Sequence, residues 1–335
     1  MSASIIILNY NNAEETAEYV GRICEYKCLD HVIIVDNAST DGSAVRLKPL
    51  CTGKVELVKS GENRGYAAGN NLGLRYVCDK YGTHGVAIIS NPDIIVSEAS
   101  VENILKAFSG REELFAVTGL VYNRYGKQIP LITWRIPTAG MLLAESSVWL
   151  RKLLWALFKY GKRYTREELT PKEAFIKGDA LPGCFFAADI EKFAGMGFFS
   201  ESTFLFYEEE ILFAEAKRRG YVSGVTTDSS LIHNEGTTIR RLNSWYKREK
   251  LMEDSCTVYM RESLHKGNGL CTLYRVWNRI CVPERYLAEK LRLMKAGKYS
   301  TGCCIACRSL YGEVCSFIFI WGLSLRKRRN GQGNT

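Results

Sequence analysis

The chain lacks the features that most quickly assign a protein to a class. Only 7 of its 335 residues are proline and 29 are glycine, which excludes a collagen-like or low-complexity chain. Long hydrophobic runs are missing too, because the apolar residues 5–8 are followed at once by Asn9-Tyr10-Asn11-Asn12. Such a run is too short for a membrane span or a signal-peptide core. We therefore expect an ordinary globular protein.

Two common nucleotide-binding signatures are also absent. No Gly-x-x-x-x-Gly-Lys-Ser/Thr phosphate loop occurs, and residues 9–12 stand where a Gly-x-Gly-x-x-Gly turn would follow the first strand. These absences argue against an ATPase and a dinucleotide-dependent oxidoreductase. A diphosphate would need another anchor, and a carboxylate-bound Mg²⁺ or Mn²⁺ can supply one because both ions take oxygen ligands and bridge phosphates.

The composition indicates a sizeable core and a basic surplus. Hydrophobic residues make up 46% of the chain and charged residues 24%, and the length suits one large domain or two ordinary ones. The net charge is +9, and the basic excess lies after residue 134. The chain has 12 cysteines, and its first predicted element is a strand and not a basic leader segment. We therefore expect free thiols in a reducing, cytoplasmic compartment.

The first part of the chain alternates between strand and helix patterns. Runs rich in β-branched residues predict buried strands, at residues 4–8, 31–35, 55–58 and 86–89. The intervening segments are predicted helices, at residues 14–26, 43–47 and 67–81. This β-α-β order predicts an α/β fold with a mostly parallel, Rossmann-like sheet and helices on both faces.

Polar loops follow all four predicted strands, at residues 9–12, 36–42, 61–65 and 91–93. Polar loops alone are unremarkable, because Asn, Asp and Gly supply turns and helix caps. Here, however, all four loops fall at the carboxyl ends of neighbouring parallel strands, where ligands bind in such sheets. Their carboxylates and amides are therefore expected to converge on one ligand.

Together these loops resemble a known family. The series Ile6-Ile-Leu-Asn-Tyr-Asn-Asn, Ile34-Val-Asp-Asn-Ala-Ser-Thr-Asp-Gly-Ser, Glu62-Asn-Arg-Gly-Tyr-Ala-Ala-Gly-Asn-Asn and Ile89-Ser-Asn-Pro-Asp-Ile is similar to glycosyltransferase family 2, especially its rhamnosyltransferase-like branch. The resemblance continues through residues 181–188, 197–210 and 231–238, and so covers about residues 1–240. It implies an inverting transferase with the A-type nucleotide-diphosphosugar fold.

The resemblance also implies where a donor nucleotide would bind. Carried over by position, Tyr10 and Asp36 would hold the nucleobase, with Asp36 accepting an imino hydrogen bond from a pyrimidine of a UDP- or dTDP-sugar. Asn63, Gly65 and Asn70 would line the nucleotide side of the site.

A second group would bind the cation and the sugar. The resemblance places Asp93 as a ligand of Mn²⁺ or Mg²⁺ and His233 on the metal side, while Asn91 stands where many relatives carry the first Asp of an Asp-x-Asp turn. Gly183 would lie beside the sugar, where a side chain would block close approach.

The base would come from three consecutive glutamates. By the family pattern Glu209 is the carboxylate that takes a proton from the acceptor, with Glu208 as its neighbour. The acidic run is equally typical of a helix N-terminus, where it compensates the dipole without any chemistry. Glu209 replaces the usual Asp, Ile211 stands at a commonly acidic position and Glu215 at one that is commonly Arg.

Two other segments carry no catalytic pattern. Within an insert at residues 122–179, residues 148–159 form an apolar helix rimmed by cations, which suits either core packing or an interfacial membrane helix. Residues 241–335 are expected to be a helical, basic extension that ends in four basic residues at 326–329. That extension could dock on the anionic cytoplasmic leaflet, giving a peripherally membrane-associated protein, or bind a partner.

The sequence therefore predicts a catalytic domain at residues 1–240 and a helical extension at 241–335. The predicted function is transfer of rhamnose or another hexose to a saccharide or lipid-linked saccharide acceptor in surface polysaccharide, O-antigen or capsule biosynthesis. The alternatives are a non-catalytic nucleotide-sugar-binding or scaffolding subunit and, less favoured, a sugar nucleotidyltransferase. Nucleic acid is not an expected partner, because the chain has no recognition fold and no interleaved aromatic platform.

Overall fold

The computed structural model of the chain describes residues 2–129, 133–158, 173–234 and 245–295. The chain divides into two compact units. We call Met1–Met141 together with Lys162–Leu273 the sheet unit, and Leu142–Gly161 together with Tyr274–Thr335 the helical unit. The second boundary falls within a helix after residue 268, and not at the predicted residue 240.

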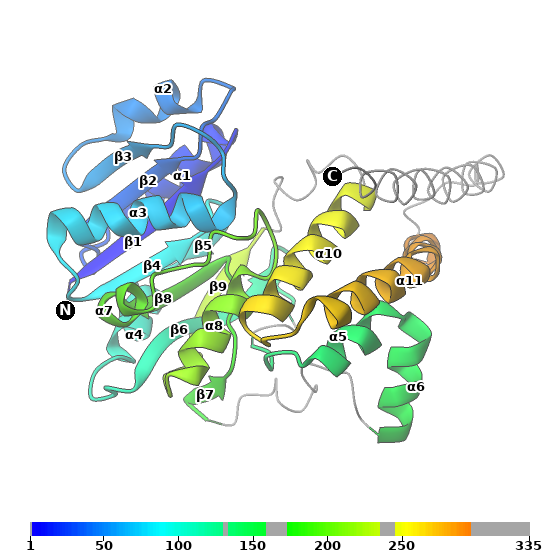
Figure 1. Cartoon of the computed structure of the whole chain (residues 1–335). Coiled ribbons are helices and arrows are strands. Elements are labelled where there is room, and N and C mark those ends of the chain that lie inside the picture. The colour runs from blue at the N-terminus through cyan, green and yellow to red at the C-terminus, as the bar shows by residue number, and fades with distance from the viewer. Residues whose placement is uncertain (1, 130–132, 159–172, 235–244, 296–335) are drawn as a thin grey trace, which may run out of the picture. The chain divides into compact units, whose positions relative to one another are not determined.

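The beginning of the sheet unit has the predicted parallel architecture (Figure 1). Its strands pair in the order β3-β2-β1-β4, all parallel. They are β1 (Ala3–Asn9), β2 (His31–Asp36), β3 (Val55–Lys59) and β4 (Val86–Ser90). The connecting helices are α1 (Ala13–Ile23), α2 (Ser43–Leu47) with the 3₁₀ turn η1 (Lys48–Leu50), and α3 (Tyr66–Tyr81). Each strand is short and rich in β-branched residues, as buried parallel strands require.

The remaining strands extend this sheet and introduce opposite directions. They are β5 (Ile94–Val96), β6 (Leu114–Asn123), β7 (Phe175–Gly178), β8 (Phe185–Asp189) and β9 (Val222–His233). The full order is β3-β2-β1-β4-β8-β6-β9-β5, with β7 also on β9. Among the described strands, β1 to β4, β6 and β9 point one way, whereas β5, β7 and β8 point the other. The predicted α/β class and mostly parallel sheet are confirmed.

Helices cover both faces of the sheet. On β1, Ile5 and Ile7 face one apolar cluster and Ile6 the other, because side chains alternate along a strand. The first cluster packs under α1 and α4 (Glu98–Lys106), and the second under α3, α7 (Ile190–Gly195) and α8 (Glu208–Arg218). Strands β1, β2 and β4 are thus shielded on both faces, which leaves the loops at their ends to meet a ligand.

Helix α10 (Trp245–Glu262) also belongs to the sheet unit. Tyr259 and Met260 are fully buried, the Tyr259 hydroxyl donates to Pro137 O at 2.6 Å, and Ser255 Oγ donates to Leu205 O at 2.8 Å. These contacts explain why the boundary between the units does not fall at residue 240. In the part of the chain that is described, no helix combines the length and apolar character that crossing a membrane requires.

The helical unit contains the end of α5 (Ala139–Ser146), α6 (Val148–Phe158) and most of α11 (Asn268–Lys295). Glu284 of α11 accepts from Ser147 Oγ at 2.8 Å and from the Trp149 N–H at 2.6 Å, and Trp277 Nε1 donates to Leu143 O at 2.8 Å. The helix predicted at residues 148–159 is therefore present as α6. None of its described side chains is buried, so core packing does not account for its apolar character. The basic block 326–329 lies outside the described residues.

Candidate active site

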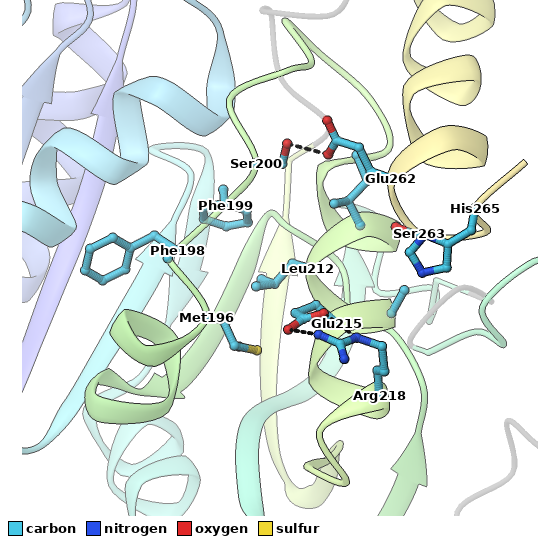
Figure 2. A pocket seen from close by; sticks show the side chains of 13 residues that line it. Met196, Phe198, Phe199, Ser200, Leu212, Glu215, Arg218, Glu262, Ser263 and His265 are labelled. Atoms are coloured by element: carbon cyan, nitrogen blue, oxygen red, sulfur yellow. Dashed lines mark hydrogen bonds and ion pairs between the residues drawn. The ribbon is translucent and has the colours of Figure 1, made fainter. Parts of the chain in front are cut away.

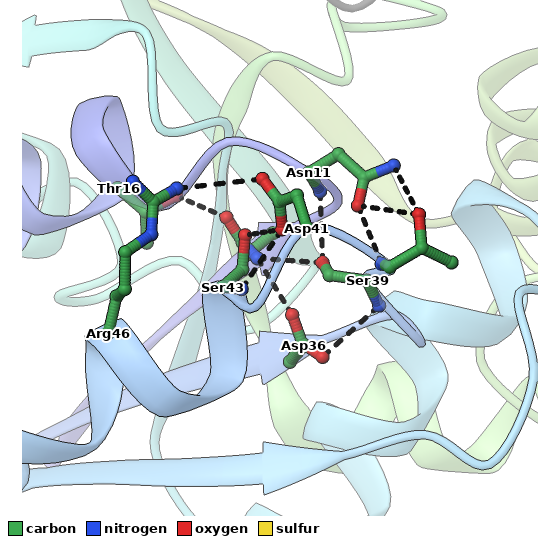
Figure 3. A network of polar contacts seen from close by, with 9 residues as sticks. Asn11, Thr16, Asp36, Ser39, Asp41, Ser43 and Arg46 are labelled. Carbon is green, nitrogen blue, oxygen red and sulfur yellow. Dashed lines mark hydrogen bonds and ion pairs between the residues drawn. The ribbon is translucent and has the colours of Figure 1, made fainter.

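The first two loops meet at the carboxyl ends of β1 and β2, where Asn9 pairs with Asp36 across the sheet (Figure 3). The buried Asp36 carboxylate accepts from Asn9 Nδ2 at 2.8 Å and from the Ser39 N–H at 3.2 Å. Thr16 Oγ1 donates to Asn9 Oδ1 at 2.9 Å, which fixes the amide. A carboxylate offers about four acceptor positions, so Asp36 can still accept a further hydrogen bond. Tyr10 directly follows Asn9 in the chain and is exposed.

The turn after Asp36 is held by a second set of contacts, also drawn in Figure 3. Asn11 adopts a left-handed conformation with φ of 52°, and its Oδ1 accepts from the Thr40 N–H at 2.7 Å. Asp41 accepts from the Ser43 N–H at 2.9 Å at the start of α2 and pairs with Arg46. The loop around Asp36 is thus ordered by its own side chains and needs no ligand to shape it.

The third loop joins this network through amides. Asn63 Oδ1 accepts from Asn37 Nδ2 and from the Gly65 N–H, each at 3.0 Å. Gly65 has a φ of 101°, and a Cβ there would lie 2.2 Å from Phe204 O, so only glycine fits. Asn70 is completely buried, and its Nδ2 donates to Tyr66 O at 3.0 Å. Asn63 and Gly65 are therefore tied to the loop that follows β2. Asn70 is tied instead to the backbone of Tyr66.

Gly183 is held between two side chains from distant parts of the chain. The Tyr66 hydroxyl donates to Gly183 O at 2.6 Å, and the Gly183 N–H donates to Glu209 Oε1 at 3.1 Å. A Cβ on Gly183 would lie 2.2 Å from the same Glu209 oxygen. The predicted sugar-side glycine and the predicted base are thus in contact. Tyr66 was not predicted to take part, because its place in an apolar helix pattern resembles that of a core residue.

The chain enters α8 through two left-handed residues. Phe206 has a φ of 76° and Tyr207 one of 66°, and such conformations cost about 1 kcal/mol each for residues other than glycine. Neighbouring contacts hold them in place: the Tyr66 N–H donates to Phe204 O at 3.0 Å, and the Tyr207 ring packs against Tyr259. Backbone strain of this kind often marks functional sites, and here it immediately precedes the turn of α8 from which Glu209 contacts Gly183.

Burial dominates the electrostatics of the glutamates. It raises the pKa of Glu209 to about 7, with the Glu210 carboxylate adding to the effect and the Gly183 N–H opposing it. Burial next to Glu209 likewise raises the pKa of Glu208 to about 9. Glu208 Oε1 is buried with no hydrogen-bond partner among the described residues. The start of a helix favours ionised carboxylates, and burial of these two glutamates opposes that effect and raises their pKa values.

The predicted metal-side residues form a pair at the carboxyl end of the sheet. His233 ends β9 opposite Ile94 of β5, and its Nε2 lies 3.2 Å from Asp93 Oδ2. Burial lowers the pKa of His233, but hydrogen bonds to Asp93 and Cys184 outweigh it and raise that pKa to about 10. The Asn91 N–H donates to Cys184 O at 2.8 Å, which brings the fourth loop against residues 183–184. The contribution of Cys184 was not predicted.

Asp93 and His233 suit a cation that acquires other ligands from its substrate. Among the described residues no cluster of three or more His, Cys, Asp or Glu side chains could hold a metal ion. Two protein donors match a nucleotide-bound cation, whose remaining positions are taken by phosphate oxygens and water. A carboxylate with an imidazole favours Mn²⁺ over the more strictly oxygen-binding Mg²⁺. The His233 proton would leave on binding, because only neutral imidazole is a ligand.

A cavity of about 440 Å³ lies elsewhere in the sheet unit and is lined by none of the predicted residues. Figure 2 shows its polar contacts, Ser200 with Glu262 and Glu215 with Arg218. The outer face of α8 lines it, so Glu215 serves surface ion pairs and does not face Gly183. The departure from the family pattern at Glu215 therefore falls outside the candidate active site.

Comparison with known proteins shows the family of this chain. The family model described as Glycosyl transferase family 2 matches residues 4–171, half of the chain. The chain belongs to glycosyl transferase family 2. The low-salt glycan biosynthesis hexosyltransferase Agl10 of Haloferax volcanii is 26% identical over 245 residues, which cover 73% of this chain and 71% of Agl10. The matched model includes the four loops but ends before Gly183, Glu208, Glu209 and His233.

Solved structures identify the fold. The mannosyltransferase PcManGT of Pyrobaculum calidifontis, in complex with GDP-Man and Mn²⁺, superposes with a TM-score of 0.54 at 15% identity and covers 93% of this family 2 chain and 79% of its own. GalNAc-T7 with UDP, GalNAc and Mn²⁺ gives 0.53 at 16% identity, covering 70% of this chain and 44% of the other. The A-type glycosyltransferase fold implied by the motifs is confirmed.

Proposed function

We propose that this family 2 glycosyltransferase is a metal-dependent, inverting hexosyltransferase that uses a nucleotide-diphosphate sugar as its donor. The observation that carries the proposal is the contact of Glu209 with the Gly183 N–H. The next residue, Cys184, interacts with His233, which is paired with Asp93. A carboxylate with a pKa raised to about 7 is a suitable base near neutral pH. The hexosyltransferase activity named for the relative Agl10 supports the reaction class.

In this mechanism the residues act at opposite ends of one displacement. Glu209 accepts the proton of the acceptor hydroxyl while that oxygen attacks the anomeric carbon of the sugar, and the nucleoside diphosphate leaves on the other face. Gly183, which has no side chain, lets the Glu209 carboxylate lie against its backbone N–H. Asp93 and His233 would hold the divalent cation, which when bound neutralises charge on the leaving diphosphate.

The nucleobase would lie between Tyr10 and Asp36. The exposed Tyr10 ring offers a stacking surface, and Asp36 retains acceptor capacity for the imino N–H of uracil or thymine. We therefore propose a UDP- or dTDP-sugar, with rhamnose or another hexose as the transferred group. The related folds bind either GDP-Man or UDP with GalNAc, so the fold alone does not select the base.

The proposed acceptor is a saccharide or a lipid-linked saccharide of a surface polysaccharide, O-antigen or capsule. The glycan biosynthesis named for Agl10 supports this class of product. A lipid-linked acceptor would place the protein in the cytoplasm, in peripheral contact with the membrane. We assign the basic residues of the chain to that location and not to nucleic-acid binding.

A non-catalytic nucleotide-sugar-binding subunit is the second candidate. Asn91 stands in place of a carboxylate, and the described residues supply only two cation donors, so the metal site is weaker than an Asp-x-Asp turn would make it. A sugar nucleotidyltransferase is disfavoured, because residues 9–12 supply no glycine-rich phosphate turn.

Calorimetric titration with UDP, dTDP and GDP, each with and without Mn²⁺, tests the donor site. We expect metal-dependent binding of UDP or dTDP that is lost in Asp93→Ala. Release of nucleoside diphosphate from the matching sugar donor in the presence of saccharide acceptors then separates the two candidates. Binding without any turnover would favour the non-catalytic subunit, whereas no binding of any nucleotide would reject the donor site.

A further inference from the structure

Helix α6 exposes most of its apolar residues. Trp149, Leu153 and Leu157 repeat at four-residue intervals along one face and are each more than half exposed, as is Phe158 at the end of the helix. Arg151 and Lys152 are exposed on the same helix, and Lys152 Nζ lies 5.1 Å from the Trp149 ring centre. An apolar stripe bordered by cations and an interfacial aromatic residue is typical of a helix that lies in a membrane surface.

Helix α11 has a second stripe of the same kind. Its residues Tyr274, Asn278 and Cys281 are buried, whereas Val276, Ile280, Leu287 and Leu291 are exposed. At 3.6 residues per turn these four exposed side chains fall within one narrow sector, opposite the buried ones. The helical unit therefore uses one face of α11 for its own packing and leaves an apolar face uncovered by any described residue.

The charge of the helical unit limits what can cover these stripes. It contains 15 Lys and Arg but only 4 Asp and Glu, a net charge of +11, which leaves −2 for the sheet unit out of the chain's +9. Residues 296–335 contribute six of the cations and one acid, so this segment cannot neutralise the rest. A second copy would bring the same positive charge. Nucleic acid would match the charge but would leave the apolar stripes in water.

We propose that the helical unit is a docking surface for an anionic phospholipid bilayer, with the exposed stripes of α6 and α11 inserted among the lipid headgroups. A bilayer carrying anionic lipid satisfies both observations, because its interface takes up apolar side chains and its headgroups attract Lys and Arg. This contact requires no transmembrane helix, and it does not depend on glycosyl transfer. The surface would keep the chain at the membrane where a lipid-linked acceptor resides.

Sedimentation of the full chain with vesicles tests the proposal. We expect binding to vesicles of phosphatidylcholine with phosphatidylglycerol, little binding to phosphatidylcholine alone, and loss of binding as salt is raised. Leu153→Glu combined with Ile280→Glu should weaken binding by about tenfold or more, since each change removes an apolar contact and adds a repelled charge. Both positions are exposed, so the fold should survive.

Val45→Glu is the matched control, because Val45 is an even more exposed apolar residue of α2 in the sheet unit. It should bind vesicles as the unchanged chain does, and circular dichroism should report the same helix content for all variants. Equal binding to both vesicle types, or binding that survives the double substitution, would overturn the proposal. A dimer in solution that the double substitution dissociates, without any vesicle binding, would assign the stripes to a second copy.

Discussion

The two units of this glycosyltransferase differ in where they bury their side chains. In the sheet unit the central strands β1, β2, β4 and β8 are largely buried, as are Asp36, Glu208 and Asp93. In the helical unit, α6 buries none of its described side chains. Burial is what shifts the pKa of a carboxylate, whereas exposure lets apolar and cationic groups meet a surface. Reaction chemistry and membrane attachment thus have opposite structural requirements, and we propose that the chain divides them between its units.

The charge balance follows the same division. The sheet unit is close to neutral at −2 and the helical unit carries +11. A strongly cationic surround would stabilise the ionised form of Glu209 and lower its pKa, whereas burial raises that pKa to about 7. Under this proposed division, substitutions in each unit should alter one function and leave the other unchanged.

Replacement of the base should give the largest effect. Glu209→Gln keeps the shape and can still accept from the Gly183 N–H, but it cannot take a proton. We expect the rate of transfer to fall by about 10²- to 10⁴-fold, with unchanged donor affinity and unchanged vesicle binding. Single-turnover assays and donor titration measure the first two. Glu215→Gln, on the outer face of the same helix, is the control and should retain its rate.

An added methyl group at Gly183 should give the next largest effect. In Gly183→Ala the new Cβ would lie 2.2 Å from Glu209 Oε1, so the carboxylate must move. A displacement of about 1 Å at a reacting group can lower a rate by roughly 10²-fold. Gly21→Ala, in helix α1 with nothing within 4 Å of its Cβ, should leave the rate intact. Equal rates in both variants would show that Glu209 is not positioned through Gly183.

The residues of the candidate active site differ in how far the sequence alone could predict them. The strand pattern predicts the polar segments that contain Asp36, Asn63 and Gly65, whereas the roles expected for these residues come from the family resemblance. Glu209 could be placed only through the family pattern. The pairing of Tyr66 with Gly183 spans 117 residues and depends on β8 pairing with β4, which periodicity does not encode.

Other features depended on packing in the same way. The left-handed conformations of Phe206 and Tyr207 occur at residues that do not favour them, so no turn signal announces them. Asn70, predicted to line the nucleotide side of the site, is buried in α3, where its Nδ2 donates to Tyr66 O. The boundary between the units was displaced by the contacts of Tyr259 in α10.

The raised pKa values predict opposite pH trends for activity and stability. Transfer should fall as pH drops through the raised pKa of Glu209, about 7, because the base becomes protonated. Folded Glu208 and Glu209 hold protons that the unfolded chain releases above its ordinary carboxyl pKa, so the free energy of unfolding should decrease as pH rises from about 5 to 8.

Glu208→Gln separates these trends. It removes one buried ionisation, so its unfolding free energy should depend less on pH than that of the unchanged chain, by at most about 1.4 kcal/mol per pH unit. Denaturant titrations at several pH values measure this slope. Glu56 has a pKa shifted in the opposite direction, so Glu56→Gln is the contrasting variant. Burial raises the pKa of Glu56, but hydrogen bonds from Lys80, Tyr76 and Tyr81 outweigh burial and lower it to about 2. An identical slope in Glu208→Gln would place the titrating group elsewhere.

The smallest predicted effect concerns Tyr66, which we expect to position Glu209 without touching the substrate. Burial and the nearby Glu209 charge keep the pKa of Tyr66 well above its usual value, so its hydroxyl stays a donor to Gly183 O. Tyr66→Phe loses this hydrogen bond and loosens Gly183, which weakens the Gly183 N–H contact that lowers the pKa of Glu209. The rate at neutral pH should fall about fivefold, for a loss of roughly 1 kcal/mol.

The pH profile distinguishes positioning from a general loss of stability. In Tyr66→Phe the acidic limb of the rate profile should move to higher pH, because Glu209 becomes easier to protonate. Tyr76→Phe is the matched control on the same helix: its hydroxyl donates to Glu56 at 2.5 Å, away from Gly183. Both variants lose one hydrogen bond and about 1 kcal/mol of stability, but only Tyr66→Phe should shift the limb. If the rate falls but the acidic limb of the pH profile does not move, Tyr66 has only a structural role. Tyr66 would then not belong to the candidate active site.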